Sequence, residues 1–252
     1  AASDVYKRQK FFLVALMAVV MGMSVTSCMK GEENNGPFPV SVVAKLETSY
    51  SGYFKMIDGT KLVPTAASSL NMPLSSGMYA VTGQYNKEDV DVNAGAITFT
   101  LASSSNIDGT SISDVEVTPD ITLFALEYQN VYPYLFDKNT LIIPALIWAK
   151  GTSEAEVTED SKKHSLTLTY DEIEAGDTEL VLHLNDVITE KADRKVLTVK
   201  HQAYNFSSLL SQFGGKLKKI TIKAKVNSSS YDLTHASTVD KSFEIDYSKI
   251  AQ

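Results

Sequence analysis

Short segments of alternating apolar and polar residues recur from residue 40 onward, and they limit the fold more than any other feature of the chain. Residues 40–47, 95–102 and 164–170 alternate in this way, which is typical of half-buried β-strands. Gly, Asp, Asn and Ser separate such segments, and only residues 205–213 place apolar side chains at helical spacing. The sequence therefore predicts an all-β protein.

Residues 40–112 have the layout of a small OB-like barrel, with several short strands between turn residues. Asp58 and Gly59 predict a hairpin, because this pair tolerates the positive φ angles of a tight two-residue turn. Pro64 is expected to end the second strand of the hairpin or to place it at a sheet edge. A further strand is expected over 77–85, where glycines suit the bends of a barrel.

Residues 113–252 predict a second β domain, with the boundary in the Ser- and Gly-rich stretch near Thr110. Seven short antiparallel strands separated by turn signals fit an immunoglobulin-like sandwich. The one helix candidate, 205–213, has Asn205 as a potential cap and is followed by Gly214 and Gly215. The strand candidates are 121–127, 140–148, 164–170, 179–184, 196–202, 217–226 and 241–247.

A segment of another kind, residues 1–27, precedes both domains. Basic residues come before an apolar run, 11–23, which is shorter than the roughly 20 apolar residues of a membrane-spanning helix. This layout is typical of a signal peptide. The first nine residues, which begin without Met, resemble a gene-boundary artefact and are not expected to contribute to the fold. The basic residues are Lys7, Arg8 and Lys10.

The signal peptide ends in Val25-Thr26-Ser27-Cys28, the pattern of a bacterial lipobox, and Cys28 is the only cysteine of the chain. We therefore expect Cys28 to carry lipid and residues 28–39 to form a flexible tether. An ordinary signal peptide followed by an incidental cysteine is the alternative. The expected location is the outer membrane, with the protein facing the periplasm or displayed on the cell surface.

Composition excludes several functional classes. The formal net charge is −7, and beyond the signal peptide basic residues concentrate only at 216–219, so nucleic-acid binding has little support. With Cys28 as the sole cysteine, neither a disulfide framework nor a thiolate metal site is expected. No cofactor-binding or catalytic motif occurs, and we predict no cofactor, no metal and no catalytic residue.

Two features allow a chemical interpretation beside a simpler one. His183 and Asp186 could form a zinc-binding or catalytic pair, but a solvated strand histidine is the simpler interpretation. A run of acidic residues could bind Ca²⁺ weakly as a loop, although it lacks EF-hand spacing, and a solvated charge run is the simpler interpretation. The acidic residues are Glu154, Glu156, Glu159 and Asp160.

Aromatic residues supply the remaining candidates for ligand contact. Tyr132 and Tyr134 flank Pro133, and Trp148 ends an apolar segment. Exposed aromatic rings with one polar end suit flat ligands such as sugars, and also protein partners. The simpler interpretation is that these rings pack into the sandwich core.

The combination resembles the NigD-like family of Bacteroidetes lipoproteins. The resemblance rests on the leader ending at Cys28, the VSVVAKLETS strand at 40–49, the YFKMIDGTKLVPT hairpin at 53–65, and the β-rich part from Ile121 onward. It implies an OB-like domain followed by a β-sandwich, and an immunity-like role. It carries over no catalytic residue.

The sequence thus predicts a membrane-anchored envelope lipoprotein that acts as a non-enzymatic binding module. The expected partner is another envelope component or a foreign protein. A glycan-binding surface lipoprotein and an enzyme of unrecognised type are the alternatives.

Overall fold

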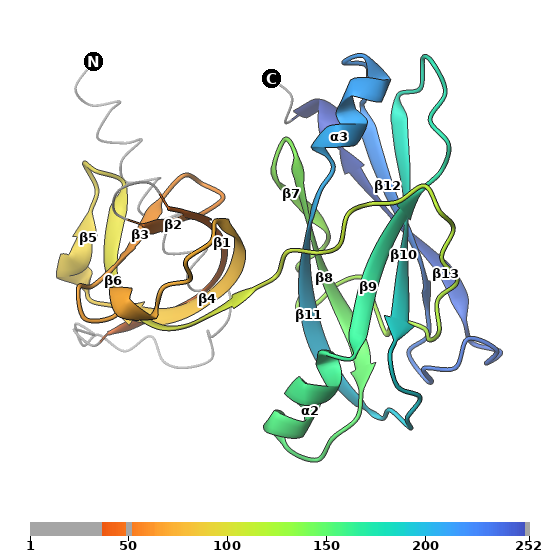
Figure 1. Cartoon of the computed structure of the whole chain (residues 1–252), viewed down its shortest axis with the longest axis horizontal. Helices are drawn as coiled ribbons and strands as arrows, with labels where there is room; N and C mark the ends of the chain where they lie inside the picture. Colours follow the sequence, from red (N-terminus) through yellow and green to blue (C-terminus); the bar gives the residue numbers. More distant parts are fainter. Residues whose placement is uncertain (1–36, 49–51, 250–252) are drawn as a thin grey trace, which may run out of the picture. The chain divides into compact units, whose positions relative to one another are not determined.

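The computed structural model of the chain describes residues 37–48 and 52–249 (Figure 1). They form two compact units that divide between Ile107 and Asp108, a few residues before the boundary expected after residue 112. The predicted fold class, an OB-like barrel followed by a β-sandwich, is confirmed. Within the described ranges, no helix has the length and apolarity to span a bilayer. The predicted signal peptide and lipobox lie outside the described residues.

The first unit is a barrel of five strands. Their order is β3-β2-β1-β4-β6, and the parallel pairing of β3 with β6 closes the ring. The short β5 pairs with the start of β6. The bounds are β1 (Phe38–Glu47), β2 (Tyr53–Lys55), β3 (Lys61–Pro64), β4 (Gly77–Tyr85), β5 (Val90–Asp91) and β6 (Ala96–Asn106), with short 3₁₀ turns η1 (Ser69–Asn71) and η2 (Lys87–Asp89).

The predicted hairpin is formed by β2 and β3, with a different turn. The Met56 N–H donates to the Thr60 carbonyl at 2.8 Å, which leaves three residues in the loop. Of these, Gly59 alone has a positive φ, 88°, and the Asp58 carboxylate accepts the Thr60 N–H at 2.9 Å. The prediction of a two-residue turn is therefore wrong, because a three-residue loop needs a left-handed residue at only one position.

Two other barrel predictions concern single residues. β3 ends at Pro64 as predicted, although it lies between β2 and β6 and not at an edge. Gly83 lies at the register shift between β4 and β6. A Cβ at Gly83 would lie 2.4 Å from the Thr100 carbonyl oxygen and 2.8 Å from the Phe99 ring, so the bend of β4 requires glycine.

The second unit is a sandwich of a four-stranded sheet, β13-β12-β10-β9, and a three-stranded sheet, β11-β8-β7 (Figure 1). The bounds are β7 (Tyr134–Asp137), β8 (Thr140–Ala149), β9 (His164–Tyr170), β10 (Glu179–Ile188), β11 (Val196–Asn205), β12 (Lys219–Val226) and β13 (Val239–Asp246). A 3₁₀ turn, η4 (Tyr247–Lys249), follows β13.

Six of the predicted sandwich strands are present, and the seventh is wrong. Residues 121–127 make only isolated bridges, at Ile121, Leu123 and Ala125, and the short β7 takes the seventh place. The expectation that all strands run antiparallel is also wrong, because β10 and β12 pair in parallel. Alternation shows that a segment is a strand but carries no information on the direction of its neighbour.

The predicted helix at 205–213 is confirmed as α3 (Ser207–Leu210) followed by the 3₁₀ turn η3 (Ser211–Phe213). The Asn205 side chain accepts the Ser207 N–H at 2.9 Å, and Gly214 ends the segment with φ of 55°. A second helix, α2 (Glu154–Ser161), was not predicted. It lies at the opposite end of the sandwich from α3 (Figure 1).

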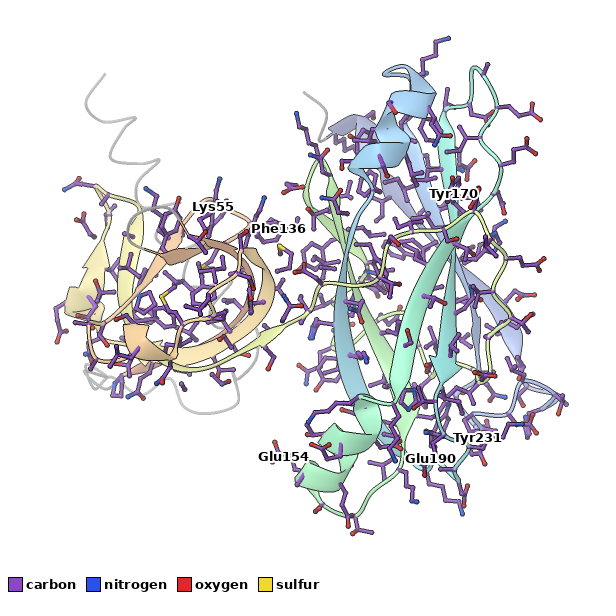
Figure 2. The ribbon with its side chains drawn as sticks, in the orientation of Figure 1. Lys55, Phe136, Glu154, Tyr170, Glu190 and Tyr231 are labelled. Atoms are coloured by element: carbon purple, nitrogen blue, oxygen red, sulfur yellow. The ribbon has the colours of Figure 1, made fainter. Side chains whose placement is uncertain are left out.

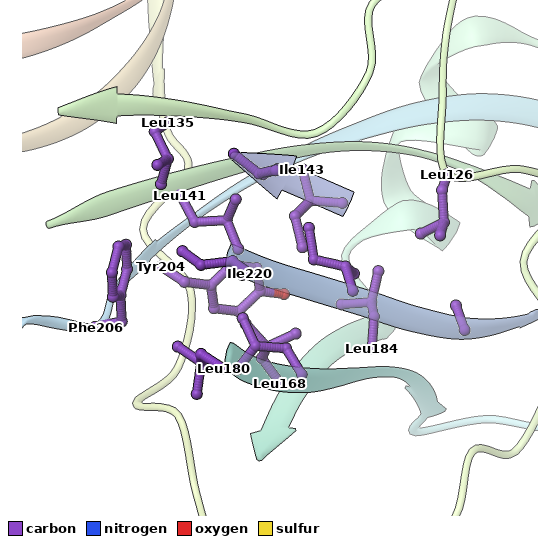
Figure 3. Close-up of a cluster of buried hydrophobic side chains, with 14 of the residues drawn as sticks. Leu126, Leu135, Leu141, Ile143, Leu168, Leu180, Leu184, Tyr204, Phe206 and Ile220 are labelled. Atoms are coloured by element: carbon purple, nitrogen blue, oxygen red, sulfur yellow. The ribbon is translucent and has the colours of Figure 1, made fainter. Parts of the chain in front are cut away.

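Each unit has its own apolar core. In the sandwich, side chains of both sheets meet around Tyr204, whose hydroxyl donates to the Leu166 carbonyl at 2.7 Å (Figure 3). In the barrel, Phe54 packs edge-on against Tyr79 and Phe99. The centre of the sandwich is therefore apolar. Polar sites are expected at its two ends, where the loops and short helices lie.

Candidate functional site

A buried network of charged side chains closes the α2 end of the sandwich. Asp160 lies in α2, His164 begins β9, Asp186 lies in β10, Arg194 lies in the loop before β11, and Lys200 lies in β11. Arg194 and Asp186 are each only 1% exposed. Charges at this depth persist only when they are paired, so their contacts define the network.

His164 joins two of these charges. Its Nδ1 lies 2.8 Å from Asp186 Oδ2, and the Arg194 Nε–H points to its Nε2 at 3.1 Å. The same Arg194 Nε–H also points to Asp160 Oδ2 at 3.1 Å, so the imidazole and the carboxylate share this one donor. Both ring nitrogens of His164 therefore have partners inside the protein.

Arg194 also pairs with Asp160. Its Nε and Nη2 donate to the Asp160 carboxylate at 3.1 and 3.3 Å, and the Lys150 backbone N–H donates to the same carboxylate at 2.8 Å. Burial raises the pKa of Asp160, but the Lys150 hydrogen bond and the Arg194 charge outweigh it, so the pKa is lowered from 3.8. Burial raises the pKa of Asp186, against the opposing effect of His164.

The network fixes the backbone around it. Arg194 Nη2 donates to the Glu190 carbonyl at 3.0 Å, and Nη1 donates to the Ala192 carbonyl at 3.4 Å. Lys200 Nζ donates to the carbonyls of Ser161 and His164 at 2.9 and 2.6 Å. The loop before β11 is therefore held to the sandwich by the buried Arg194, and the end of α2 by the half-buried Lys200.

A surface pocket of about 920 Å³ opens beside this network. One wall is the loop at residues 191–195, which Arg194 holds, and the other is the loop at residues 229–232. Asp120, Ile121 and Trp148 also line the pocket. Figure 2 shows Tyr231, which belongs to the second loop, and Glu190, which directly precedes the first loop, at the same end of the sandwich.

Asn227 organises the second wall. Its side-chain oxygen accepts the N–H groups of Ser229 and Ser230 at 2.8 and 3.1 Å, and its amide donates to Thr238 Oγ1 at 3.0 Å. Its backbone carbonyl accepts the Trp148 indole N–H at 3.2 Å. Because Asn227 is 1% exposed, the wall is fixed from inside the protein.

The three aromatic residues predicted to contact ligand do not share one surface. Trp148 is 8% exposed and lies in the pocket lining. Tyr132 is 42% exposed and stacks on Phe243 with the ring centres 5.4 Å apart. Tyr134 is half-buried, and burial raises its pKa to about 12. Of the three, only Trp148 belongs to the pocket.

The alternative pairing of His183 with Asp186 is not formed, and His183 is a partly exposed strand histidine, as the simpler interpretation has it. His183 Nε2 lies 2.7 Å from Asp171 on the outer surface, whereas Asp186 pairs with the buried His164. Residues three apart on a strand point to opposite faces, so His183 and Asp186 cannot meet. No group of three or more metal-ligating side chains comes together within the described ranges.

The acidic run is also not a loop, since it forms α2. Ser153 caps the helix by accepting the Glu156 N–H, and Glu156 accepts the N–H and hydroxyl of Thr152 at 2.7 and 2.8 Å. Acidic side chains in a first helical turn are stabilised by the exposed N–H groups there. Asp160 differs from the others because it turns inward to Arg194.

Sequence reasoning missed Arg194, although one signal was present. Arg194 is the only arginine after Arg8, in a chain that otherwise uses lysine. A planar guanidinium can bridge a carboxylate, an imidazole and two carbonyls at once, which a lysine ammonium cannot. A solitary arginine in a lysine-rich chain therefore indicated a position where this geometry is needed.

Fold and site together define a β protein with an OB-like barrel, a sandwich and a rigid pocket at one sandwich end. No protein-family model and no curated protein matches the sequence. Among solved structures, the chain is similar to a Bacteroides fragilis NCTC 9343 protein described as a "putative lipoprotein", with 27% identity and a TM-score of 0.73. The match covers 83% of this chain and 98% of that one.

Two further solved structures share the fold. A NigD-like immunity protein from Bacteroides caccae ATCC 43185 has 13% identity and a TM-score of 0.52, over 86% of this chain and 99% of that one. An uncharacterised protein from Parabacteroides merdae ATCC 43184 has 14% identity and a TM-score of 0.52, over 82% and 99%. Together these likenesses show that the chain shares its two-unit β fold with proteins of Bacteroides and Parabacteroides, one of which is described as a lipoprotein.

Proposed function

We propose that this protein is an outer-membrane lipoprotein, anchored through lipid on Cys28, whose folded units act as a non-enzymatic binding module. The pattern Val25-Thr26-Ser27-Cys28 supports the anchor, as does the similarity to the Bacteroides fragilis protein. Each buried CH₂ contributes about 0.8 kcal/mol, so the two or three acyl chains of a lipoprotein hold it firmly.

Metabolic labelling with a fatty-acid probe tests the anchor. Cys28→Ala should abolish labelling, because no other thiol exists to accept the lipid. Thr26→Ala keeps a small residue in the lipobox and should remain labelled. Labelling of the Cys28→Ala protein at the level of the unchanged chain would contradict the proposal.

The observation that carries the binding role is the pocket at the α2 end of the sandwich, between two loops that Arg194 and Asn227 fix from inside. A preformed site loses little conformational freedom when a ligand binds. This geometry therefore supports recognition of a partner by rigid loops.

The hydrogen bonds of His164 support a binding role over catalysis. Its side chain is fully buried, and both ring nitrogens are occupied by Asp186 and Arg194. A general base must reach the proton that it removes, and His164 does not reach solvent. Every buried polar side-chain atom in the described part of the chain has a hydrogen-bond partner, so the network acts as a support.

If the role is immunity-like, the partner that this protein binds is a foreign protein. The support is the fold that the chain shares with the NigD-like immunity protein from Bacteroides caccae. Loop ends of sandwiches are common positions for protein recognition, although a fold alone does not determine a function.

Cross-linking of intact cells, followed by membrane solubilisation and capture of the tagged full chain, tests the binding role. A stoichiometric protein absent from the unanchored Cys28→Ala control would support the immunity-like form. Enriched polysaccharide without protein would support a binding module with another ligand. Capture of neither above the control would overturn the binding role.

A further inference from the structure

The pocket between residues 191–195 and 229–232 has the size of a ligand site. Its volume of about 920 Å³ falls in the range of roughly 300–1,000 Å³ that is usual for small-molecule sites. Such sites are usually lined by apolar side chains, whereas this lining is rich in charged and hydroxyl groups. The ligand must therefore be polar over much of its surface.

Charges of both signs line the pocket, with no large excess of either. Three exposed carboxylates face two exposed ammonium groups, and the third basic residue, Arg194, is 1% exposed and is neutralised by the buried Asp160. An uncharged ligand avoids the repulsion that either ion would meet. The acidic residues are Asp120, Asp193 and Asp232, and the basic residues are Lys191, Arg194 and Lys195.

Several of these charges are already compensated within the protein. Lys195 pairs with Asp193 at 2.5 Å, Arg194 pairs with the buried Asp160, and Asp232 accepts the N–H and hydroxyl of Thr234 at 2.8 Å. A charged ligand would have to compete with these pairs. A neutral ligand can instead share the carboxylate lone pairs that remain free, because each carboxylate accepts several hydrogen bonds.

The lining also contains aromatic surface. Tyr231 is half-buried, and its hydroxyl lies 3.4 Å from Asp193. Trp148 also belongs to the lining. Aromatic rings that combine an apolar face with a polar end suit a ligand whose own surface alternates C–H and O–H groups.

We propose that this pocket binds a neutral carbohydrate, with the Tyr231 ring packing against a sugar face and Asp193 and Asp232 accepting hydrogen bonds from its hydroxyls. The inference rests on the proposed binding role, and it names a ligand class other than the protein of the immunity-like form. Arg194 and Asn227 are positioning residues, because they fix the two walls without belonging to the contact itself.

The test uses the full chain with neutral oligosaccharides of glucose and mannose, and with uronic-acid oligosaccharides as the charged comparison. Trp148 is the only tryptophan and lies in the lining, so its fluorescence reports binding. Tyr231→Ala should weaken binding of the neutral sugar at least about tenfold. Tyr132→Ala, a matched aromatic change outside the pocket lining, should leave it unchanged.

Three results would overturn the inference: no neutral sugar bound at millimolar concentration, a preference for the uronic-acid oligosaccharides, or equal affinity of the Tyr231→Ala and unchanged proteins. Failure of this kind is separable from failure of the binding role. A protein partner captured from cells without any sugar binding would keep the binding module and reject the carbohydrate. Neutral sugar bound with the expected effect of Tyr231→Ala would support both.

Discussion

The barrel and the sandwich bury different kinds of side chain. In the described part of the barrel unit, the buried polar residues are Thr60 and Ser68, and the core is otherwise apolar. The sandwich has an apolar core of the same kind at its centre, but it closes one end with His164, Asp186 and Arg194. Both units are β-structures, and the described part of the barrel forms without buried charged side chains. Strand formation by itself therefore does not require them.

The difference teaches what the buried charges contribute. A buried ion pair is often no more stabilising than well-packed apolar residues of the same volume, but removing one partner is strongly destabilising. The barrel closes without such a cost. In the sandwich, Arg194 donates hydrogen bonds to the backbone carbonyls of Glu190 and Ala192. The buried charges therefore fix the position of the first pocket loop more than they determine the fold.

The two units can be followed separately during unfolding. Trp148 is the only tryptophan and lies in the sandwich, so its fluorescence reports the sandwich, whereas circular dichroism reports strands of both units. Each variant below therefore has an expected location as well as an expected size of effect.

The largest effect is expected for Arg194→Met. Methionine is apolar and of similar length, so the change leaves the Asp160 carboxylate buried without its cation and His164 Nε2 without its donor. Losing one partner of a buried pair costs about 3–5 kcal/mol. The free energy of unfolding obtained from the urea transition of Trp148 fluorescence should fall by this amount, and the transition should move to lower urea.

Lys195→Met is the matched control, because this exposed neighbour in the same loop pairs only with the exposed Asp193. Its effect on the free energy of unfolding should be within about 1 kcal/mol. If Arg194→Met had an equally small effect, the network would not hold the end of the sandwich. The sandwich would then depend on buried charges no more than the barrel does.

The next effect belongs to the barrel. In Gly83→Ala the new methyl group would lie 2.4 Å from the Thr100 carbonyl oxygen, and because backbone cannot move aside cheaply, strain of about 1–3 kcal/mol is expected. The part of the dichroism change that comes from the barrel should move to lower urea, while the transition measured by Trp148 fluorescence stays in place. Gln84→Ala, an exposed change on the same strand, is the control, and a shift of both transitions would mean that the units do not unfold separately.

The same contrast explains what the sequence could predict. Barrel features such as the hairpin around Gly59 and the bend at Gly83 are written in neighbouring residues, because turn and bulge geometry depends on local φ angles. The helix after Asn205 was predictable for the same reason. Direction of pairing was not predictable, since β10 and β12 are parallel neighbours separated by β11 in the chain.

The site could not be predicted, because its contacts join distant positions. His164 meets Asp186 across a strand pair, and Arg194 reaches back to Asp160. Alternation states which residues of one strand share a face, but not which residues of another strand face them. The solitary arginine was the one signal that a composition count offered.

The third prediction concerns acid. The Asp160 pKa lies below 3.8 in the folded protein, so its folded carboxyl releases a proton more readily than the unfolded one. Stability from Asp160 is therefore present above about pH 4 and is lost as pH falls through the folded pKa. The raised pKa of Asp186 acts in the opposite direction, because protonation then favours the folded state.

Asp160→Asn removes only the first of these effects. The drop in the Trp148 unfolding midpoint between about pH 5 and about pH 3 should be smaller in Asp160→Asn than in the unchanged chain. Asp91→Asn, an exposed change in the barrel, should leave the drop unaltered. An equal drop in Asp160→Asn and the unchanged chain would show that other carboxylates cause the acid sensitivity of the sandwich.

The smallest effect should come from His183→Ala, which compares two histidines of one sheet. His183 pairs with Asp171 on the surface, where the two side chains are 38% and 55% exposed, and such pairs contribute about 0.2–1 kcal/mol. His164→Ala removes the donor of the buried Asp186 and the acceptor of Arg194, which costs about 1–3 kcal/mol or more. Both changes report through Trp148, so the same urea titration ranks them. If His183→Ala lowered the free energy of unfolding as much as His164→Ala, burial would not account for the difference between the two pairs. The surface pair of His183 with Asp171 would then have to stabilise the sheet as strongly as the buried pair.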